Sequence, residues 1–228
     1  MDRHVVEQYR LALFGRMVMG VAHEIDNHLS VVLGFSELIR LAPGKEQKVR
    51  EGAGKILSAG EKIGGIVQHF SRHARPHAPS REPFVPGEMI PEILLFSRYD
   101  LGRDNVTVLP IPEVPRGILH ADRRDFALAI LALLFNAAEA MSEAGGELSL
   151  RVSIDAAGWE FAVSDQGPGI PAGLEEKVFE VGFTTRTGTV HTGMGLPVAR
   201  HLAGQAGGTL QLSNGTGGGC VATIRLPM

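Results

Sequence analysis

The chain has 228 residues, of which 44% are hydrophobic and 21% are charged, and its formal net charge is -3. This composition is ordinary for a chain that buries a core, and the small negative charge excludes the basic footprint of a nucleic-acid-binding protein. The single cysteine, Cys220, excludes an intramolecular disulfide and fits a reducing compartment. No apolar run is long enough for membrane insertion and none resembles a signal peptide, so we expect a cytoplasmic protein.

Residues 1–75 are predicted to form a helical hairpin. Apolar residues recur every seven positions in both halves, which is typical of a coiled coil or helical bundle. The first stripe is Leu11, Val18, Ile25, Val32 and Ile39, and the second is Val49, Ile56, Ile63 and Phe70, with Gly52, Ala59 and Ile66 between them. Residues 41–44 predict a short turn between the two helices. Because two helices cannot bury both seams alone, we expect a homodimer with a four-helix bundle.

The pattern changes after the hairpin. Residues 76–82 contain Pro76 and Pro79 and are predicted to be a linker, and residues 83–228 are predicted to be a second domain. Its patterns predict helices at 87–101, 122–141 and 195–206 and strands at 106–109, 148–154, 159–164, 209–213 and 221–226. Helices mixed with antiparallel hairpins indicate an α+β fold with an α/β sandwich.

Three segments of this second domain have the chemistry of a nucleotide site. Asp165 follows an apolar strand and can accept a hydrogen bond from an exocyclic amine such as adenine N6, and Gly167 and Gly169 let a flat ring approach the backbone. Gly193 and Gly195 precede a helix whose free N–H groups can face phosphate oxygens. Asn136 lies within an otherwise apolar helix. Each segment alone is also compatible with an ordinary turn, loop or core asparagine.

The order of these segments is more specific than any one of them. Asn136 to Ala140, Asp165 to Gly169, Phe179 to Arg186 and Thr192 to Leu196 together resemble the N, G1, F and G2 boxes of the GHKL-type ATP-binding domain over roughly residues 83–228. This resemblance implies that ATP and Mg²⁺ bind here. It assigns Mg²⁺ to Asn136, adenine to Asp165 and the phosphates to Gly193 and Gly195. It also makes residues 172–192 a lid, with Arg186 a candidate phosphate contact.

A second resemblance lies in the hairpin. His23-Glu24-Ile25-Asp26-Asn27 is similar to the H box of histidine kinase dimerisation domains, His-Glu-x-x-Asn. The family resemblance therefore implies a sensor histidine kinase, in which ATP phosphorylates His23 and the phosphoryl group passes to an aspartate of a response regulator receiver domain. In that family the residue at the place of Asn27 can also orient water for dephosphorylation of the partner.

The residues of the H box fit this chemistry. Imidazole is neutral in useful amounts near pH 7, and a carboxylate at Glu24 that accepts the Nδ1 proton of His23 would leave Nε2 as the nucleophile. Phosphoryl transfer then depends on in-line positioning and on Mg²⁺. Hydrolytic relatives of the ATP fold carry a glutamate one helical turn before the metal-binding asparagine, but this chain has Ala132 there. A different acceptor is therefore expected.

The H box departs from the family pattern at two positions. Proline is common after the residue matched by Asn27, but this chain has His28, so the helix is expected to be straighter. Asp26 adds a second carboxylate beside the site. A separate group, His69, His73 and His77, is spaced by four, but Pro76 breaks the helix before His77, so a metal-binding face is not favoured.

Two alternatives remain open at this point. One is a dimeric phosphorelay scaffold that carries a phosphoryl group on His23 without using ATP, and the other is an anti-sigma serine kinase of the same ATP fold. No segment resembles a sensor domain, so we expect the signal to come from a separate sensor subunit or from sequence beyond this segment. The stimulus and the response regulator are not encoded in any motif.

Overall fold

The computed structural model describes residues 1–103, 105–185 and 192–228, apart from the side chains of residues 99 and 103. Its helices are α1 (Arg3–Leu41), α2 (Glu46–Ala74), α3 (Pro86–Arg103), α4 (Arg123–Ala140), α5 (Gly195–Gln205) and the short 3-10 helix η1 (Lys177–Phe179). Its strands are β1 (Glu82–Phe84), β2 (Val106–Val108), β3 (Leu119–Ala121), β4 (Gly146–Asp155), β5 (Gly158–Ser164), β6 (Thr209–Asn214) and β7 (Cys220–Leu226). Every helix and strand predicted from the sequence is confirmed, within a few residues at the ends.

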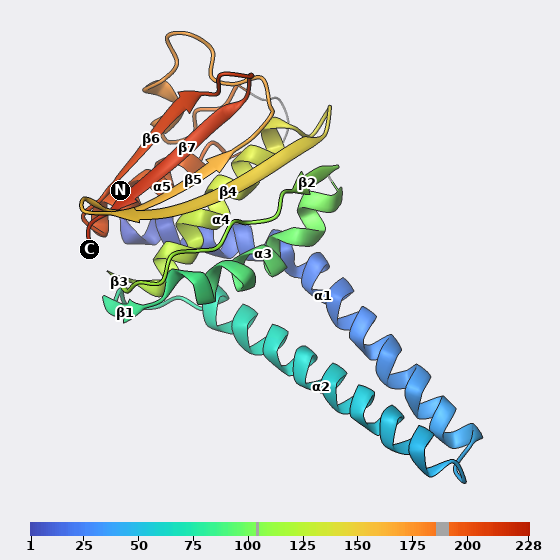
Figure 1. The fold of residues 1–228 in the computed structure, drawn as a ribbon. Helices are drawn as coiled ribbons and strands as arrows, with labels where there is room; N and C mark the ends of the chain where they lie inside the picture. Colours follow the sequence, from blue (N-terminus) through green and yellow to red (C-terminus); the bar gives the residue numbers. More distant parts are fainter. Residues whose placement is uncertain (104, 186–191) are drawn as a thin grey trace.

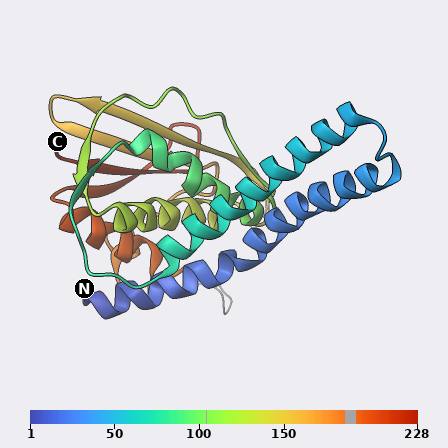
Figure 2. The ribbon, with the colours of Figure 1, turned by 90° about the horizontal axis from the view of Figure 1, so that it is seen from below.

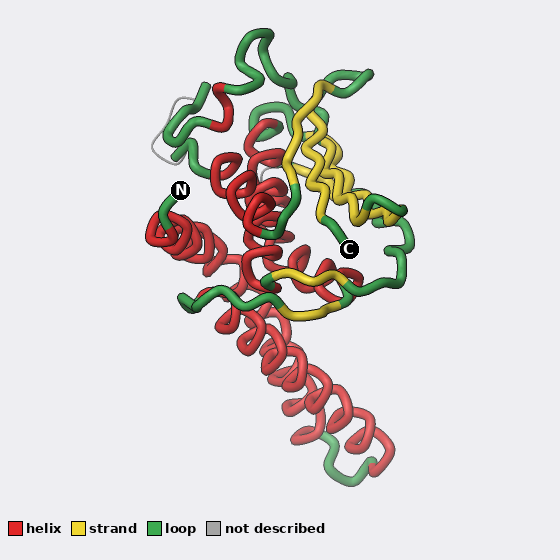
Figure 3. Tube along the Cα trace, turned by 90° about the vertical axis from the view of Figure 1, so that its left-hand side faces the viewer, coloured by secondary structure: helices red, strands yellow, loops and turns green. Residues whose placement is uncertain are grey.

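The second domain is built on a five-stranded sheet with the order β2-β4-β5-β7-β6. The β2–β4 pair is parallel and the other neighbours are antiparallel. Buried and more exposed residues alternate along β4, with Leu148, Leu150 and Val152 on the buried face. This alternation is the pattern of a sheet that packs against helices on one face, and Figure 1 and Figure 3 show the helices gathered on that side.

Helix α4 lies in the middle of the molecule. Every residue from Asp125 to Phe135 is buried, which is expected of a helix that is covered on all sides. The sheet covers one side of α4, and the hairpin approaches the helical layer from the other (Figure 2). Residues that lie on α4 therefore reach both the sheet domain and α1.

The hairpin has two differently packed halves. Its far half, with the turn near Pro43, projects away from the sheet domain (Figure 1 and Figure 2). The first half of α1 lies along the sheet domain instead, and Val6, Leu13, Phe14 and Met17 are buried there.

The apolar stripe predicted on α2 is confirmed. All seven of its positions are buried or half-buried: Val49, Gly52, Ile56, Ala59, Ile63, Ile66 and Phe70. Gly52 lies where the two helices approach closely, since a Cβ at that position would make a tight contact of 3.0 Å with the side chain of Ile39. The α1 stripe divides at its middle. Ile25, Val32 and Ile39 are half-buried, whereas Leu11 and Val18 are 53% and 49% exposed.

One short sheet was not predicted from the sequence. Strands β1 and β3 pair antiparallel across Glu82–Ala121, Pro83–His120 and Phe84–Leu119. Each strand has three residues, too few to show an alternating pattern, and Pro83 lies in one of them. The pair joins the end of the linker to the residue before Asp122, which caps the N-terminus of α4.

His73 lies at the junction of α1, α2 and α3. The residue is 1% exposed, with its ring stacked on Phe14 and edge-on to Phe96. Neither ring nitrogen has a hydrogen-bond partner among the described residues, and Nε2 lies 3.8 Å from Oε2 of Glu92. Burial, followed by the charge of Arg10, lowers the pKa of His73 to about 3. The folded protein therefore holds this imidazole neutral.

We predict that His73→Phe stabilises the fold and removes part of its pH dependence. An unfolded histidine titrates near pH 6.5, so the unfolded chain binds a proton between pH 6.5 and about 3 that folded His73 does not. As the pH falls below 6.5, the stability of the wild-type fold therefore decreases by about 1.4 kcal/mol per pH unit on account of His73, and the Phe variant lacks this decrease. Phe at this position also removes two unpaired buried nitrogens, worth about 1–3 kcal/mol near pH 7.

Urea unfolding between pH 4 and 7.5 measures both effects. His69→Phe is the matched control, because His69 lies one turn earlier on α2 and is only half-buried. A His73→Phe protein that is less stable than wild type at pH 7, or that keeps the wild-type slope with pH, would contradict this account.

Candidate active site

A cavity of about 270 Å³ opens between α1, α4, α5 and the loops that follow β5. Five residues predicted to bind nucleotide or metal line it: Asn136, Asp165, Gly169, Gly193 and Gly195. Ala132 also lines it. The structure therefore brings together the N, G1 and G2 segments, which are separated by up to 59 residues in the sequence.

Asp165 is held by the backbone around it. Its Oδ1 accepts hydrogen bonds from the N–H groups of Gly167, at 2.8 Å, and Cys220, at 3.1 Å. Gly167 does not line the cavity; a Cβ there would lie 2.9 Å from both Oδ1 of Asp165 and Cβ of Ala140. The role of Gly167 is thus to let the loop pack on the end of α4 and orient the carboxylate.

Gly219, just before β7, was not predicted as a site residue. Its φ of +75° lies in the left-handed region, and a Cβ built on it would overlap the carbonyl oxygen of Asp165. Its neighbour Cys220 lines the cavity, and burial raises the pKa of that thiol to about 11. Cys220 is therefore protonated at neutral pH and suited to packing rather than to redox chemistry.

The start of α5 is suited to an anion. Gly195 is the first residue of this helix, and among the described residues no side chain caps its N-terminus. The first N–H groups of a helix have no partner within the helix, and they carry the positive end of its dipole. Gly193, Met194 and Gly195 all line the cavity, so these groups lie beside it.

Helix α1 forms one wall of the same cavity through Tyr9, Ala12, Leu13 and Arg16. A Cβ at Gly195 would lie 3.3 Å from the hydroxyl oxygen of Tyr9. Burial, followed by the negative charge of Glu139, raises the pKa of Tyr9 well above its usual range, so the hydroxyl keeps its proton. Tyr9 and Arg16 were not predicted as site residues, although Tyr9, Arg16 and His23 follow one another at intervals of seven residues in the sequence.

The H-box residues lie outside this cavity. His23 and Asn27 are exposed on α1 and Glu24 is half-buried, and none of the three is among the described residues that line the cavity. Glu24 faces along its own helix to His28, with 3.7 Å between Oε1 and Nε2. Arg186, the candidate phosphate contact, lies outside the described residues.

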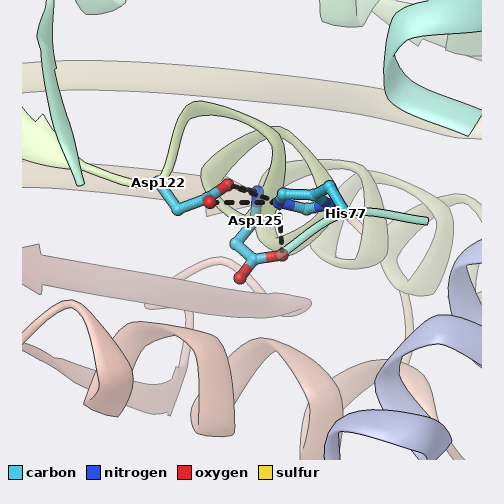
Figure 4. A group of neighbouring side chains, drawn as sticks. All are labelled: His77, Asp122 and Asp125. Carbon is cyan, nitrogen blue, oxygen red and sulfur yellow. Dashed lines mark hydrogen bonds and ion pairs between the residues drawn. The ribbon is translucent and has the colours of Figure 1, made fainter. Parts of the chain in front are cut away.

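A group of charged residues fastens α1 and the linker to the start of α4. Nε2 of His77 lies 2.9 Å from Oδ1 of Asp122 and 3.8 Å from Oδ1 of Asp125 (Figure 4). Because its nearest partners are carboxylate oxygens, Nε2 carries the proton. Burial of Asp122 opposes its charge, but hydrogen bonds from His77 and from the Ser80 and Asp125 N–H groups outweigh this and lower its pKa well below the usual range.

This charged group is structural rather than a metal site. Asp125 already pairs with Arg10 and with Arg3, each at 2.6 Å. Two guanidinium groups neutralise the carboxylate that a cation would need. The linker is thus tied to the start of α4 at His77 and Ser80, and to the end of α5 at Arg81, which donates to the carbonyl of Gln205.

Comparison with known proteins agrees with this geometry. The family described as histidine kinase-, DNA gyrase B-, and HSP90-like ATPase matches residues 121–228. Over its whole length the chain is similar to sensor kinases. It is 28% identical to the C4-dicarboxylate transport sensor protein DctB of Rhizobium meliloti, over 95% of this chain and 35% of that protein. It is 24% identical to the signal transduction histidine-protein kinase AtoS of Escherichia coli, over 100% of this chain and 37% of that protein.

Residues 121–228 thus match the ATPase family, and the whole chain is similar to sensor histidine kinases. It spans little more than a third of the length of these two relatives. Among solved structures, the catalytic domain of the histidine kinase ThkA has 26% identity and a TM-score of 0.58, covering 65% of this chain and 97% of that chain. The mycobacterial sensor histidine kinase MprB has 28% identity and a TM-score of 0.54, covering 65% of this chain and 100% of that chain. The ATP-binding fold predicted for the second domain is confirmed.

We predict that Gly219→Ala weakens ATP binding to this chain at least about tenfold. Alanine at a left-handed φ costs about 1–2 kcal/mol, and its Cβ would push the Asp165 carbonyl, and with it the carboxylate, out of place. Equilibrium titration with a fluorescent ATP analogue measures the change.

Gly217→Ala is the matched control for this prediction, because nothing lies within 4 Å of its Cβ position and its φ is not left-handed. Unchanged binding in Gly219→Ala, or equal loss in both variants, would show that the backbone at Gly219 does not set the position of Asp165.

Proposed function

We propose that this chain is the catalytic core of an ATP-dependent protein-histidine kinase, which phosphorylates His23 and passes the phosphoryl group to an aspartate of a response regulator. The observation that carries the proposal is the shared wall of the nucleotide cavity. Helix α1, which contains His23, forms that wall together with the residues predicted to bind ATP. The helix that carries the proposed phosphoacceptor thus lies against the proposed nucleotide site of the same chain.

The residues around the cavity fit Mg·ATP. The side-chain oxygen of Asn136, on α4, is the proposed ligand for Mg²⁺, whose charge offsets that of the phosphates during transfer. Asp165 accepts a hydrogen bond from the adenine amine, and its orientation is fixed in advance by Gly167 and Cys220. The open N-terminus of α5 at Gly193 to Gly195 receives the phosphates.

The side chains of the H box supply the acceptor. His23 is exposed on α1, so its ring is accessible to a nucleotide that is brought alongside it. Glu24 accepts the Nδ1 proton, Nε2 attacks the γ-phosphorus in line, and the bond to the β,γ-bridging oxygen breaks to release ADP. His28 shares the Glu24 carboxylate at 3.7 Å, in the place where relatives commonly have proline.

Hydrolysis of ATP is disfavoured on the opposite side of the cavity. The position one turn before Asn136 is Ala132, which is 1% exposed and has no group that could activate water. The phosphoryl group is therefore kept for a protein acceptor. This argument favours a kinase over an ATPase. The residues suited to ATP favour the kinase over a phosphorelay scaffold that works without ATP.

The exposed apolar surface of the hairpin supports a homodimer. Leu29, Leu33, Leu38, Leu41 and Leu57 are between 42% and 69% exposed. Leucines at this density are expected to be covered by a second copy of the hairpin in a four-helix bundle. In this proposal residues 1–75 serve dimerisation and phosphotransfer, 76–82 connect, and 83–228 bind ATP.

The proposed partner is a receiver domain. The kinase ThkA has been solved in complex with the response regulator protein TrrA, and a partner of the same kind would take the phosphoryl group from His23. Asn27, exposed one turn beyond His23, would orient water for dephosphorylation of the partner's aspartate. The signal would come from a separate sensor subunit or from sequence beyond this segment. None of the helices in the described residues is long and apolar enough to cross a membrane.

We predict that incubation with γ-labelled Mg·ATP labels the wild-type chain and that His23→Gln abolishes the label. Phosphohistidine is a phosphoramidate, so the label should be lost in acid and kept in alkali. Asp165→Asn should reduce labelling at least about tenfold, because it weakens the charged acceptor for the adenine amine. Scintillation counting after acid and alkali treatment measures both variants.

His4→Gln is the matched control, because His4 is an exposed histidine on the same helix. Acid-stable label in wild type would indicate a serine kinase, and label that survives in His23→Gln would place the acceptor elsewhere. Nucleotide binding without any label would favour the phosphorelay scaffold.

A further inference from the structure

The face of α1 that lines the nucleotide cavity is the face that carries His23. Tyr9, Arg16 and His23 are spaced by seven residues, so they lie within about 40° of one another around the helix. Tyr9 and Arg16 line the cavity, whereas His23 does not. The cavity therefore lies on the face of α1 that carries His23, but it lies beside residues 9–16, which precede His23 in the helix.

The remaining distance is too long for the reaction. Seven residues of α-helix correspond to about 10.5 Å along the axis, whereas reacting atoms must approach to about 3–3.5 Å. In this arrangement Arg16 occupies the place, beside the nucleotide cavity, that His23 needs. A movement of one heptad along α1 would exchange the two residues and keep the same face towards the cavity.

Arg16 fastens the ATP-binding domain in this register. Its Nη1 donates a hydrogen bond of 2.5 Å to Oε1 of Glu139, and its Nε lies 3.8 Å from Oδ1 of Asp100. The guanidinium group also stacks 4.6 Å over the ring of Phe135. The side chains of Arg16 and Glu139 are each 19% exposed, so solvent screens their interaction less than it screens an ion pair on the open surface.

The position of Glu139 connects this contact to the nucleotide site. Glu139 lies one turn beyond Asn136 on α4 and lines the cavity. The Arg16–Glu139 pair therefore joins the helix that carries the phosphoacceptor to the helix proposed to hold the metal ion. Breaking this pair removes a polar contact between the two helices beside the cavity, while Arg10 still pairs with Asp125 at the start of α4.

We propose that Arg16 is a positioning residue of the kinase reaction: its pair with Glu139 holds the nucleotide site one heptad short of His23, and autophosphorylation requires this pair to break. The inference rests on the proposed kinase function. It makes Arg16 a brake on phosphoryl transfer rather than a ligand of the nucleotide.

The test measures the initial rate of phosphohistidine formation against ATP concentration. The variants are Arg16→Glu, Arg16→Lys and the charge exchange Arg16→Glu with Glu139→Arg. Arg40→Glu is the control, because Arg40 is an exposed arginine of α1 that pairs with Glu37 far from the cavity. Circular dichroism confirms that each variant is folded.

The expected result for Arg16→Glu is a kcat about tenfold above wild type with the KM for ATP changed less than about twofold. A tenfold change corresponds to about 1.4 kcal/mol of barrier. Arg16→Lys, which keeps the charge but loses the planar group, should fall between the two. The charge exchange should return kcat towards the wild-type value, which a purely structural role of Arg16 would not produce.

Three outcomes separate this proposal from others. A kcat for Arg16→Glu equal to that of wild type and Arg40→Glu would overturn the brake. A KM raised tenfold with kcat unchanged would make Arg16 a nucleotide ligand and also overturn it. If neither wild type nor any variant, Arg16→Glu included, forms phosphohistidine, then the kinase function itself fails.

Discussion

The arrangement of the molecule depends on the buried ion pair between Arg10 and Asp125. Arg10 is fully buried on α1, and its Nη2 lies 2.6 Å from Oδ1 of Asp125 at the start of α4. Removing one partner of a buried pair leaves an uncompensated charge, at a cost of about 3–5 kcal/mol. The pair therefore keeps the first half of α1 on the ATP-binding domain, and the shared wall of the nucleotide cavity follows from that contact.

Helix α4 carries this constraint from one end of the site to the other. Its first turn holds Asp122 and Asp125, which bind the linker and α1. Its last turns hold Asn136 and Glu139, which line the cavity. Because the helix between them is buried on every side, the two ends are expected to move as one body. The docking of α1 and the shape of the nucleotide site are therefore mechanically connected.

The sequence predicted the elements well because each one has a long, regular pattern. The α2 stripe and the alternation in β4 are examples, and the order of four motifs singled out five residues that line one cavity. Contacts between distant segments have no such periodic signal. The heptad stripe of α1 could not show that Val6, Leu13 and Met17 face the second domain, while Leu11 and Val18 are left exposed. Nor could a run of glycines show that Gly219 supports Asp165.

Methionine oxidation offers the most direct test of the docked α1. Met17 and Met19 lie two residues apart on this helix, but Met17 is 0% exposed and Met19 is 67% exposed. The experiment follows the oxidation of each by dilute hydrogen peroxide, resolved by peptide mass spectrometry in the folded wild-type chain. If α1 packs on the ATP-binding domain as described, Met19 should oxidise at least about tenfold faster than Met17, because burial excludes the oxidant. Equal rates at the two positions would show that the first half of α1 is not held on that domain, and would contradict the shared wall of the nucleotide site.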